Sequence, residues 1–481
     1  MLTLPDAISL PHQIEPAEGA PFLEASRLEE WLTRRLDNSE QAAERLLDLL
    51  KSIASARLDS PLLQQIAPLL SPHVQHCSER FEHRFAKCRF PLPAEEYSKA
   101  ATARELLLQF ALIQKRVAIV ALANRPVDEA GLMRAIEAMI AHLGRALFQA
   151  ALLYLPPPVD FWRELHRLYQ FAESRSSTVY APDGIASEYL STLTFSATAP
   201  HRMHPKEMVA VAGLLPEWHH YAQLVPASNE TTGEHRLVID LESDSPPLPA
   251  ATLERSDGLD RYRLLDLAAL QIYLRKLAEN DPNVMPIPFV LLKKLLQAFS
   301  APPSRGFFRV QGSLILNTCW GIDSIHRRLD ADEPPDAVPL KVVNESATGY
   351  CVAWDEATPT PLQIGEIAGI SRQTETHQLA LGVVRWMRNS IVNGPRVGIE
   401  ILSSQANAIE TNNFNGRGNK ALLLPAVRAT GRPETIILPP QGEHSGQVLQ
   451  IMGPSGTRSI RLTRLLESTP AFTHYQFDVQ H

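Results

Sequence analysis

The sequence has 481 residues, which is too long for one compact core, so we expect about two to four domains. Hydrophobic residues make up 44% of the chain and charged residues 21%, the balance of a folded globular protein rather than a disordered one. The net charge of −7 argues against a protein that coats nucleic acid, because that function needs a broad basic surface. A local basic pocket is still compatible with this total.

The N-terminus and the cysteines indicate the compartment. "MLTLPDAISLPHQIEP" has no basic region, and Pro, Asp and His interrupt its apolar residues, so it does not resemble a signal peptide. The stretch "LGRALFQAALLYLPPPVDFW" meets a triple proline before it reaches the roughly 20 residues of a membrane span. Neither a C-x-x-C pair nor disulfide-framework spacing occurs among Cys77, Cys88, Cys319 and Cys351. We therefore expect a cytoplasmic protein in a reducing compartment, with no membrane span.

The first 300 residues predict a mainly helical region. Residues 1–22 are rich in proline and predict an extended arm, and from residue 23 onward apolar residues recur at i, i+3, i+4 and i+7. The helical pattern continues in "PKEMVAVAGLLPEWHHYAQLV" and "YRLLDLAALQIYLRKLAEN", with one predicted strand, "HRLVIDLES", between them. We assign 23–300 to this region, which can divide into two subdomains near 175–200.

Beyond residue 300 the pattern changes to strands. Short β-branched runs alternate with Gly, Pro, Asn and Asp turns over 301–410, which is typical of a small antiparallel barrel or sandwich. Further predicted strands in 411–481 either form a second small β unit or extend the first. The acidic stretch "GIDSIHRRLDADEPPDA" is interpreted as an insertion that shields or reshapes a pocket. The fold class is thus multidomain α+β.

The search for catalytic or metal-binding motifs returns one weak candidate. On a helix, His73 and Cys77 would share a face suited to zinc, and His76, His83 and Cys88 lie nearby. This cluster lacks the paired short spacings of structural zinc sites, so we expect no metal there. "GPSGTRS" lacks the Gly-Lys-Ser/Thr ending of a phosphate-binding loop, and neither G-x-S-x-G nor H-E-x-x-H occurs. We therefore expect a protein that is not an enzyme.

Two short motifs flank the first predicted strands. Arg305 and Arg309 form R-x-x-x-R in "SRGFFRV", where the chain leaves the helical region. Asn344-x-Ser346-x-x-Gly349 follows about 35 residues later, in a turn between two hydrophobic runs. Glycine in such a turn indicates either a positive φ or a close approach of another backbone.

In this order, the motifs resemble those of the PilZ domain, a six-stranded β-barrel that serves bacteria as a receptor for cyclic di-GMP. "LGVVRWMRN" and "RVGIEIL" are similar to the last strands of that family, so the resemblance covers about residues 300–405. It implies that Arg305 and Arg309 contact guanine edges and phosphates, because a guanidinium is a planar fork of donors. Asn344, Ser346 and Gly349 would form the second wall of the site. The helical region resembles no family that these motifs identify.

The resemblance implies a cyclic di-GMP effector that uses no cofactor. Ligand binding would change the orientation of the helical module or its binding of a protein partner, whose identity the sequence does not reveal. The alternative is a non-enzymatic interaction scaffold whose PilZ-like barrel binds no nucleotide. Titration with cyclic di-GMP separates the two.

Overall fold

The computed structural model divides the chain into two compact units, which we describe one at a time. The first unit holds Met1–Cys88, Leu92–Pro200 and Pro205–Pro302, and the second holds Arg89–Pro91, His201–His204 and Pro303–His481. Within these units the structure describes residues 4, 9–36, 41–176, 183–227, 236–249, 259–279, 287–300, 309–312, 314–330, 337–354, 362–372, 379–390, 394–412, 418–427, 431–440, 444–453 and 456–480.

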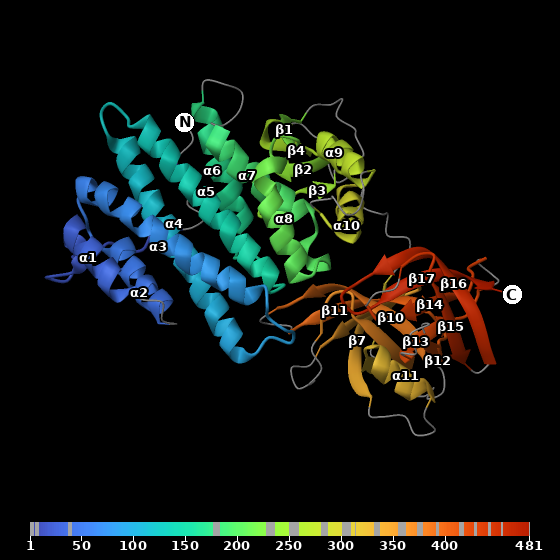
Figure 1. The fold of residues 1–481 in the computed structure, drawn as a ribbon. Helices are drawn as coiled ribbons and strands as arrows, with labels where there is room; N and C mark the ends of the chain where they lie inside the picture. Colours follow the sequence, from blue (N-terminus) through green and yellow to red (C-terminus); the bar gives the residue numbers. More distant parts are fainter. Residues whose placement is uncertain are drawn as a thin grey trace. The chain divides into compact units, whose positions relative to one another are not determined.

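The first unit begins with helices, as the periodicity of the sequence predicts (Figure 1). Two of them start at aspartate caps: the side chain of Asp59 accepts a hydrogen bond from the N–H of Leu62 (2.9 Å), and that of Asp128 accepts one from Gly131 (2.9 Å). The helices are α1 (Ala25–Arg35), α2 (Ala42–Ser55), α3 (Ser60–Phe85), α4 (Ala94–Ala123), α5 (Glu129–Leu152), α6 (Phe161–Arg175), α7 (Asp183–Ala197) and α8 (Pro205–Trp218).

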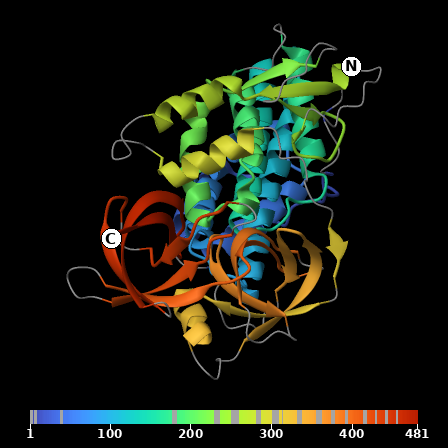
Figure 2. The same cartoon turned by 90° about the vertical axis from the view of Figure 1, so that its right-hand side faces the viewer.

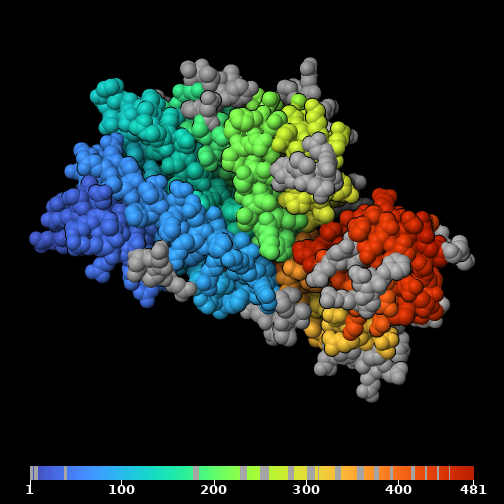
Figure 3. Space-filling view, in the orientation of Figure 1, coloured from blue at the N-terminus to red at the C-terminus, as the bar shows by residue number. Residues whose placement is uncertain are grey.

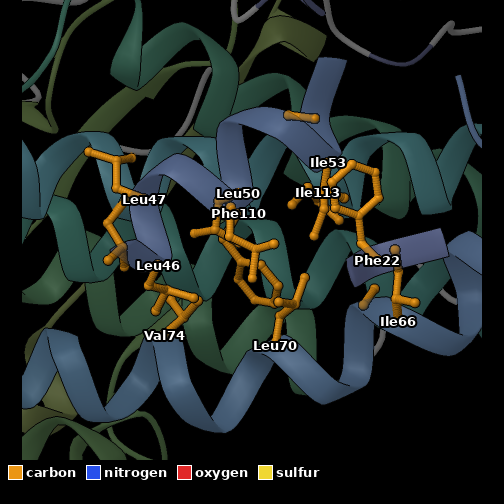
Figure 4. Packing of buried hydrophobic residues seen from close by; sticks show 14 of the residues in the cluster. Phe22, Leu46, Leu47, Leu50, Ile53, Ile66, Leu70, Val74, Phe110 and Ile113 are labelled. Carbon is orange, nitrogen blue, oxygen red and sulfur yellow. The ribbon is translucent and has the colours of Figure 1, made fainter. Parts of the chain in front are cut away.

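The apolar stripes of the first helices meet in one core. In Figure 4, Leu50 of α2, Leu70 of α3 and Phe110 of α4 point toward one another, and all three are fully buried. Burial of such side chains is the main source of stability for the helices, each worth about 1.5–3 kcal/mol. By length and composition alone, α4 qualifies as a membrane-spanning helix, but 61% of its most apolar window is buried inside the structure.

A small antiparallel sheet, in the order β1-β4-β2-β3, follows the helices. Its strands are β1 (Gln223–Pro226), β2 (Arg236–Asp240), β3 (Leu248–Pro249) and β4 (Tyr262–Asp266), and α9 (Ala268–Ala278) and α10 (Phe289–Phe299) complete the unit. The prediction of helix for "YRLLD" and "QLV" is wrong, because both segments lie in strands. Leu264 and Leu265 are buried in the sheet, and the Asp266 side chain accepts a hydrogen bond from the N–H of Ala268 (3.0 Å) at the start of α9.

The second unit begins with a six-stranded β-barrel, if β5 and β6 are counted as one strand, and this is the fold that the PilZ resemblance implies. Pairing runs in a closed circuit through β6, β9, β10, β11, β8 and β7, and β7 returns to β6. β5 also pairs with β7, on the stretch that follows the β6 pairing, so β5 and β6 are two pieces of one interrupted strand. The strands are β5 (Val310–Gln311), β6 (Ile315–Trp320), β7 (Val338–Ser346), β8 (Gly349–Ala353), β9 (Ile367–Arg372), β10 (Ala380–Arg388) and β11 (Arg396–Ser403).

The remaining strands form a second, closed barrel (red in Figure 2). Its interior is filled by aliphatic side chains and Tyr475. This result resolves the two options left by the sequence, since the C-terminal strands do not extend the first barrel. The strands are β12 (Asn407–Asn412), β13 (Gly418–Leu424), β14 (Thr435–Leu438), β15 (Val448–Gly453), β16 (Gly456–Ser468) and β17 (Thr473–Gln480).

The predicted acidic insertion contains a helix, α11 (Ile322–Asp330), which the sequence interpretation missed. Ile322 and Ile325 are buried in a cluster that includes Ile367 of β9 and Leu422 of β13. The helix therefore packs between the two barrels of the second unit, against β6, β9, β12 and β13. Its described part serves as core, and the rest of the insertion, 331–336, lies outside the described residues.

Candidate functional site

The Asn344–Gly349 segment is a tight hairpin between β7 and β8. Ser346 pairs with Gly349, so Ala347 and Thr348 form a two-residue loop, and both are exposed. The Ser346 hydroxyl donates to the carbonyl of Gly349 at 3.3 Å, and the N–H of Ile401 donates to the carbonyl of Thr348 at 2.9 Å. The hairpin is thus held both internally and against β11.

Gly349 meets the second of the two requirements that the sequence suggested, the close approach of another backbone. It is not one of the glycines with a positive φ. A Cβ atom at this position would lie 2.1 Å from the carbonyl oxygen of Ile399 in β11, which no real side chain tolerates. Glycine is needed here because β8 and β11 come close together at the corner.

The strand register brings Arg309 to this corner. Val310 pairs with Glu345 and Gln311 with Asn344. Continuing this register by one residue places Arg309, just before β5, opposite Ser346. Alternate residues of a strand share a face, which places Arg309 with Gln311, Asn344 and Ser346. Arg309 is exposed there. Arg305, the other half of the predicted pair, lies outside the described residues.

Five further residues, from β8, β10 and β11, occupy the same face. Cys351 pairs with Asn344 on one side and Gly398 on the other, Gly398 pairs with Trp386, and Arg396 pairs with Arg388. Residues 396 and 398 are two apart and therefore share a side of β11. The opposite side carries Val352 and Val397, which are fully buried in the barrel. The face with the arginines is accordingly the outer face of the barrel.

The Trp386 side chain covers Gly398 on this face. A Cβ atom on Gly398 would lie 1.8 Å from the indole nitrogen, so the ring occupies the space above that glycine. The guanidinium of Arg388 lies 5.9 Å from the centroid of the Trp386 ring, a cation–π distance. An aromatic plane bordered by cations is suited to stacking a base beside its phosphate.

The arginines on the face hold unneutralised positive charge. Burial raises the pKa of the Cys351 thiol, and the charges of Arg396, Arg309 and Arg388 oppose that rise, so all three lie within electrostatic range of one buried atom. Within the described part of the chain, none of the three forms an ion pair with a carboxylate. We call Arg309, Arg388 and Arg396 the arginine cluster. Like charges placed together without acidic partners favour an anionic ligand.

Sequence reasoning found Arg309 and the hairpin but did not assign Arg388, Arg396 or Trp386 to the site. The segments that contain them were recognised only as barrel strands. The available signal was the alternation in "RWMR" and "RVG", where polar or small residues at every second position indicate an outward side. Which outward residues meet depends on pairing between distant strands, and one sequence does not specify that.

The predicted absence of metal sites concerns α3. Among the residues that the structure describes, no group of three or more His, Cys, Asp or Glu side chains could hold a metal ion. Cys77 is buried, and Cys88 lies against the carboxylate of Glu96 at 3.5 Å.

Comparison with known proteins identifies the class of each part. Residues 26–228 match the family described as the N-terminal domain of the cyclic-di-GMP receptor FimW, residues 327–408 match its middle PilZ domain, and residues 405–480 match its C-terminal beta-barrel domain. The middle match confirms the PilZ resemblance. It begins after Arg309, so the arginine pair lies upstream of the matched segment. The helical region, which the motifs left without a family, has one as well.

The similarity to a curated relative extends over most of the chain. The cyclic-di-GMP receptor FimW of Pseudomonas aeruginosa is 24% identical over 509 aligned positions, which cover 86% of this chain and 83% of the relative. No solved structure matches the chain. The chain thus has regions similar to the N-terminal, middle PilZ and C-terminal beta-barrel domains of that receptor family, in this order.

Proposed function

We propose that this chain is a cyclic di-GMP effector that binds its ligand on the outer face of the PilZ barrel. The observation that carries the proposal is the arginine cluster, which shares that face with the Asn344–Gly349 hairpin and has no acidic partner in the described residues. The matched families and the relative support the identity of the ligand.

The face supplies the groups that a cyclic dinucleotide needs. Its two phosphates require cations on two sides, and Arg309 reaches the face from β5, while Arg388 and Arg396 reach it from the β10–β11 hairpin. Guanine presents O6 and N7 acceptors that match a guanidinium fork. We assign Arg305 and Arg309 to these contacts, with Arg388 and Arg396 opposite them.

The hairpin forms the second wall, from Asn344, Ser346 and Gly349. The Asn344 amide offers both donors and an acceptor. The Ser346 hydroxyl donates to the Gly349 carbonyl, so toward a ligand it would serve as an acceptor. Gly349 contributes no side chain and instead keeps the corner close to β11.

The position of Arg309 in the chain suggests how ligand binding would affect the helical region. Arg309 immediately precedes β5, and residues 301–308 connect it in sequence to the helical region. A ligand that bridges Arg309 to Arg388 and Arg396 favours conformations in which the start of β5 is held against β7. This is a population shift, because the ligand contacts Arg309 only in the conformations in which β5 is held against β7. Its output would be altered binding of a protein partner by the helical region.

Calorimetric titration of cyclic di-GMP into the full-length protein tests the site. Arg309→Ala, Arg388→Ala and Arg396→Ala should each weaken binding about tenfold or more, as expected for loss of a charge-assisted contact. Arg461→Ala removes an exposed arginine from β16 of the C-terminal barrel and should leave affinity unchanged. Undiminished binding in all three cluster variants overturns the site.

The alternative function is an interaction scaffold whose barrel binds no nucleotide. It gains support from the position of the arginine pair upstream of the matched PilZ segment. Absence of heat with the wild-type protein, together with an unchanged melting temperature in cyclic di-GMP, would establish it.

We also propose a cytoplasmic location. All four cysteines are free thiols, and three of them are buried, which suits a reducing compartment. Cell fractionation followed by immunoblotting for the protein tests this, and recovery of the protein in the cytoplasmic fraction is the expected result.

A further inference from the structure

The helical unit contains a cavity that the proposed nucleotide site does not use. It has a volume of about 400 Å³ and lies among α3, α5, α7 and α8. Figure 3 shows α3 (blue) and α8 (green) beside each other on one face of the molecule. Its polar lining consists of Ser71, Gln75, Glu82, His142, Arg145, Glu188, Ser191 and Thr192.

Two phenylalanines give the cavity an apolar wall. Phe148 of α5 and Phe195 of α7 meet edge to face, with ring centroids 5.4 Å apart. One turn earlier on α5, Gly144 allows the two helices to approach, because a Cβ there would lie 2.4 Å from the Thr192 hydroxyl oxygen. The cavity therefore combines an aromatic surface with polar groups, as small-molecule sites do.

The one cation in the lining is already neutralised. Arg145 Nε lies 2.6 Å from Glu82 Oε1, and its Nη2 lies 3.1 Å from Glu82 Oε2. The Gln149 amide also donates to Glu82 Oε1, at 3.2 Å. This two-point pairing leaves neither Arg145 nor Glu82 with a strong demand for a ligand.

Glu188 is different, because its carboxylate has no hydrogen-bond or ion-pair partner among the described residues. It stands at the rim of the cavity, with part of its side chain in solvent. Desolvation raises the pKa of this carboxyl group, and the neighbouring Glu137 carboxylate raises it further. Two carboxylates against one guanidinium leave the lining with one uncompensated negative charge.

His142 adds a second unpaired acceptor. Burial lowers its pKa, so the imidazole is neutral near pH 7. Its Nδ1 donates to the carbonyl of Ala138, which leaves Nε2 as an acceptor without a partner in the described residues. The ring itself is held edge-on against Phe110, with centroids 4.8 Å apart.

We propose that this cavity binds an organic cation, an ammonium or guanidinium group on a short apolar stem. Glu188 neutralises the charge, His142 Nε2 accepts a hydrogen bond, and the stem lies against Phe148 and Phe195, where a cation–π contact adds affinity. A free amine and a lysine or arginine side chain of a partner protein carry the same chemistry. The cavity would make the helical unit a ligand-binding domain in its own right.

Saturation-transfer NMR titrations on the full-length protein test the proposal. Putrescine and agmatine probe free amines, Nα-acetyl-lysine amide and Nα-acetyl-arginine amide probe side chains, and uncharged 1-pentanol is the negative control. At least one cationic probe should bind, and Glu188→Gln should weaken it about tenfold or more. The set that binds more tightly identifies the source of the cation.

Two controls make the result specific. Glu44→Gln makes the same charge change on the exposed face of α2 and should leave cation binding intact. Cyclic di-GMP titration of Glu188→Gln should match that of the wild type, so a failed nucleotide site and a failed cation site give different results. If no cationic probe binds, or if Glu188→Gln binds as tightly as the wild type, the proposal is wrong.

Discussion

Arg385 of β10 and Glu467 of β16 form an ion pair that joins the two barrels of the second unit, with Nη2 3.0 Å from Oε2. Arg385 also donates through Nε to Glu400 of β11 at 2.5 Å. It sits at the irregularity between Val384 and Trp386, next to the ring that covers the candidate site. One guanidinium thus links β10 and β11, which carry Arg388, Arg396 and Trp386, to the C-terminal barrel.

Replacing Arg385 with methionine should destabilise that junction. The change leaves Glu400 and Glu467 without their shared cation, at a cost of about 2–3 kcal/mol for a partly buried pair. Hydrogen exchange should speed up in β10, β11 and β16, while α2–α5 stay protected. Arg461→Met, on the exposed side of β16, is the matched control. Unchanged exchange in all three strands would contradict the role assigned to Arg385.

Gly398→Ala should displace the Trp386 ring from its position over residue 398 on the outer face. The new methyl group would lie 1.8 Å from the Trp386 indole nitrogen, so the ring must move, at a cost of about 1–3 kcal/mol. We expect a shift in tryptophan emission and weaker cyclic di-GMP binding. Gly213→Ala in α8 is the control, because nothing lies within 4 Å of its added Cβ. Wild-type emission in Gly398→Ala would show that the indole does not need this space.

A buried ion pair in the helical unit gives a prediction about stability. Lys115 of α4 and Glu164 of α6 are 3.4 Å apart, and their side chains are 2% and 0% exposed. Glu164→Leu alone leaves a buried ammonium without its carboxylate and should cost about 3–5 kcal/mol of unfolding free energy. Adding Lys115→Met should restore most of that loss.

Denaturant titration followed by circular dichroism measures both variants. Glu30→Leu, which breaks the exposed Glu30–Arg34 pair of α1, should change stability by less than about 1 kcal/mol. If the double variant is no more stable than Glu164→Leu, the loss has a source other than the broken Lys115–Glu164 ion pair.

His474 makes the C-terminal barrel sensitive to acid. Its pKa is lowered to about 4, chiefly by burial, and its Nε2 lies 2.9 Å from the Thr435 hydroxyl. An unfolded histidine titrates near 6.5, so the unfolded chain takes up a proton first as the pH falls. Stability is therefore complete above about pH 6.5 and decreases down to about pH 4, by roughly 3 kcal/mol.

Thermal melts at pH 7.5 and 4.5 test this titration. His474→Gln keeps a hydrogen-bonding side chain but cannot titrate, so its melting temperature should fall less between the two pH values than that of the wild type. An equal fall in both proteins would assign the acid sensitivity to other groups.

Local patterns in the sequence were enough for much of the fold. The helices between residues 23 and 155 follow from their 3.6-residue periodicity, and the β7–β8 hairpin follows from two hydrophobic runs around a small polar turn. Tyr262–Asp266 was missed because a short apolar run next to a helix fits either structure. α11 was missed because its charged residues obscure Ile322 and Ile325, which are apolar on one side only.

The sequence predicted only part of the candidate site, because part of it depends on pairing between distant strands. The hairpin and Arg309 lie in motifs that are close in sequence, whereas Arg388 and Arg396 join them only through the pairing of β10 with β11 and of β11 with β8. That pairing is a property of the closed barrel. The positive charge of the arginine cluster forms only when the barrel folds, so it could not be predicted from a sequence whose net charge is negative.

The break between β5 and β6 has a consequence for the affinity of the proposed site. Among the described residues, β5 is held to β7 by two residue pairs, and Val310 within it is 63% exposed, so this pairing contributes little free energy to the position of Arg309. The measured affinity for a ligand then includes the cost of ordering that short strand. At the proposed site, affinity would therefore depend on residues that do not contact the ligand, through the strength of the β5–β7 pairing.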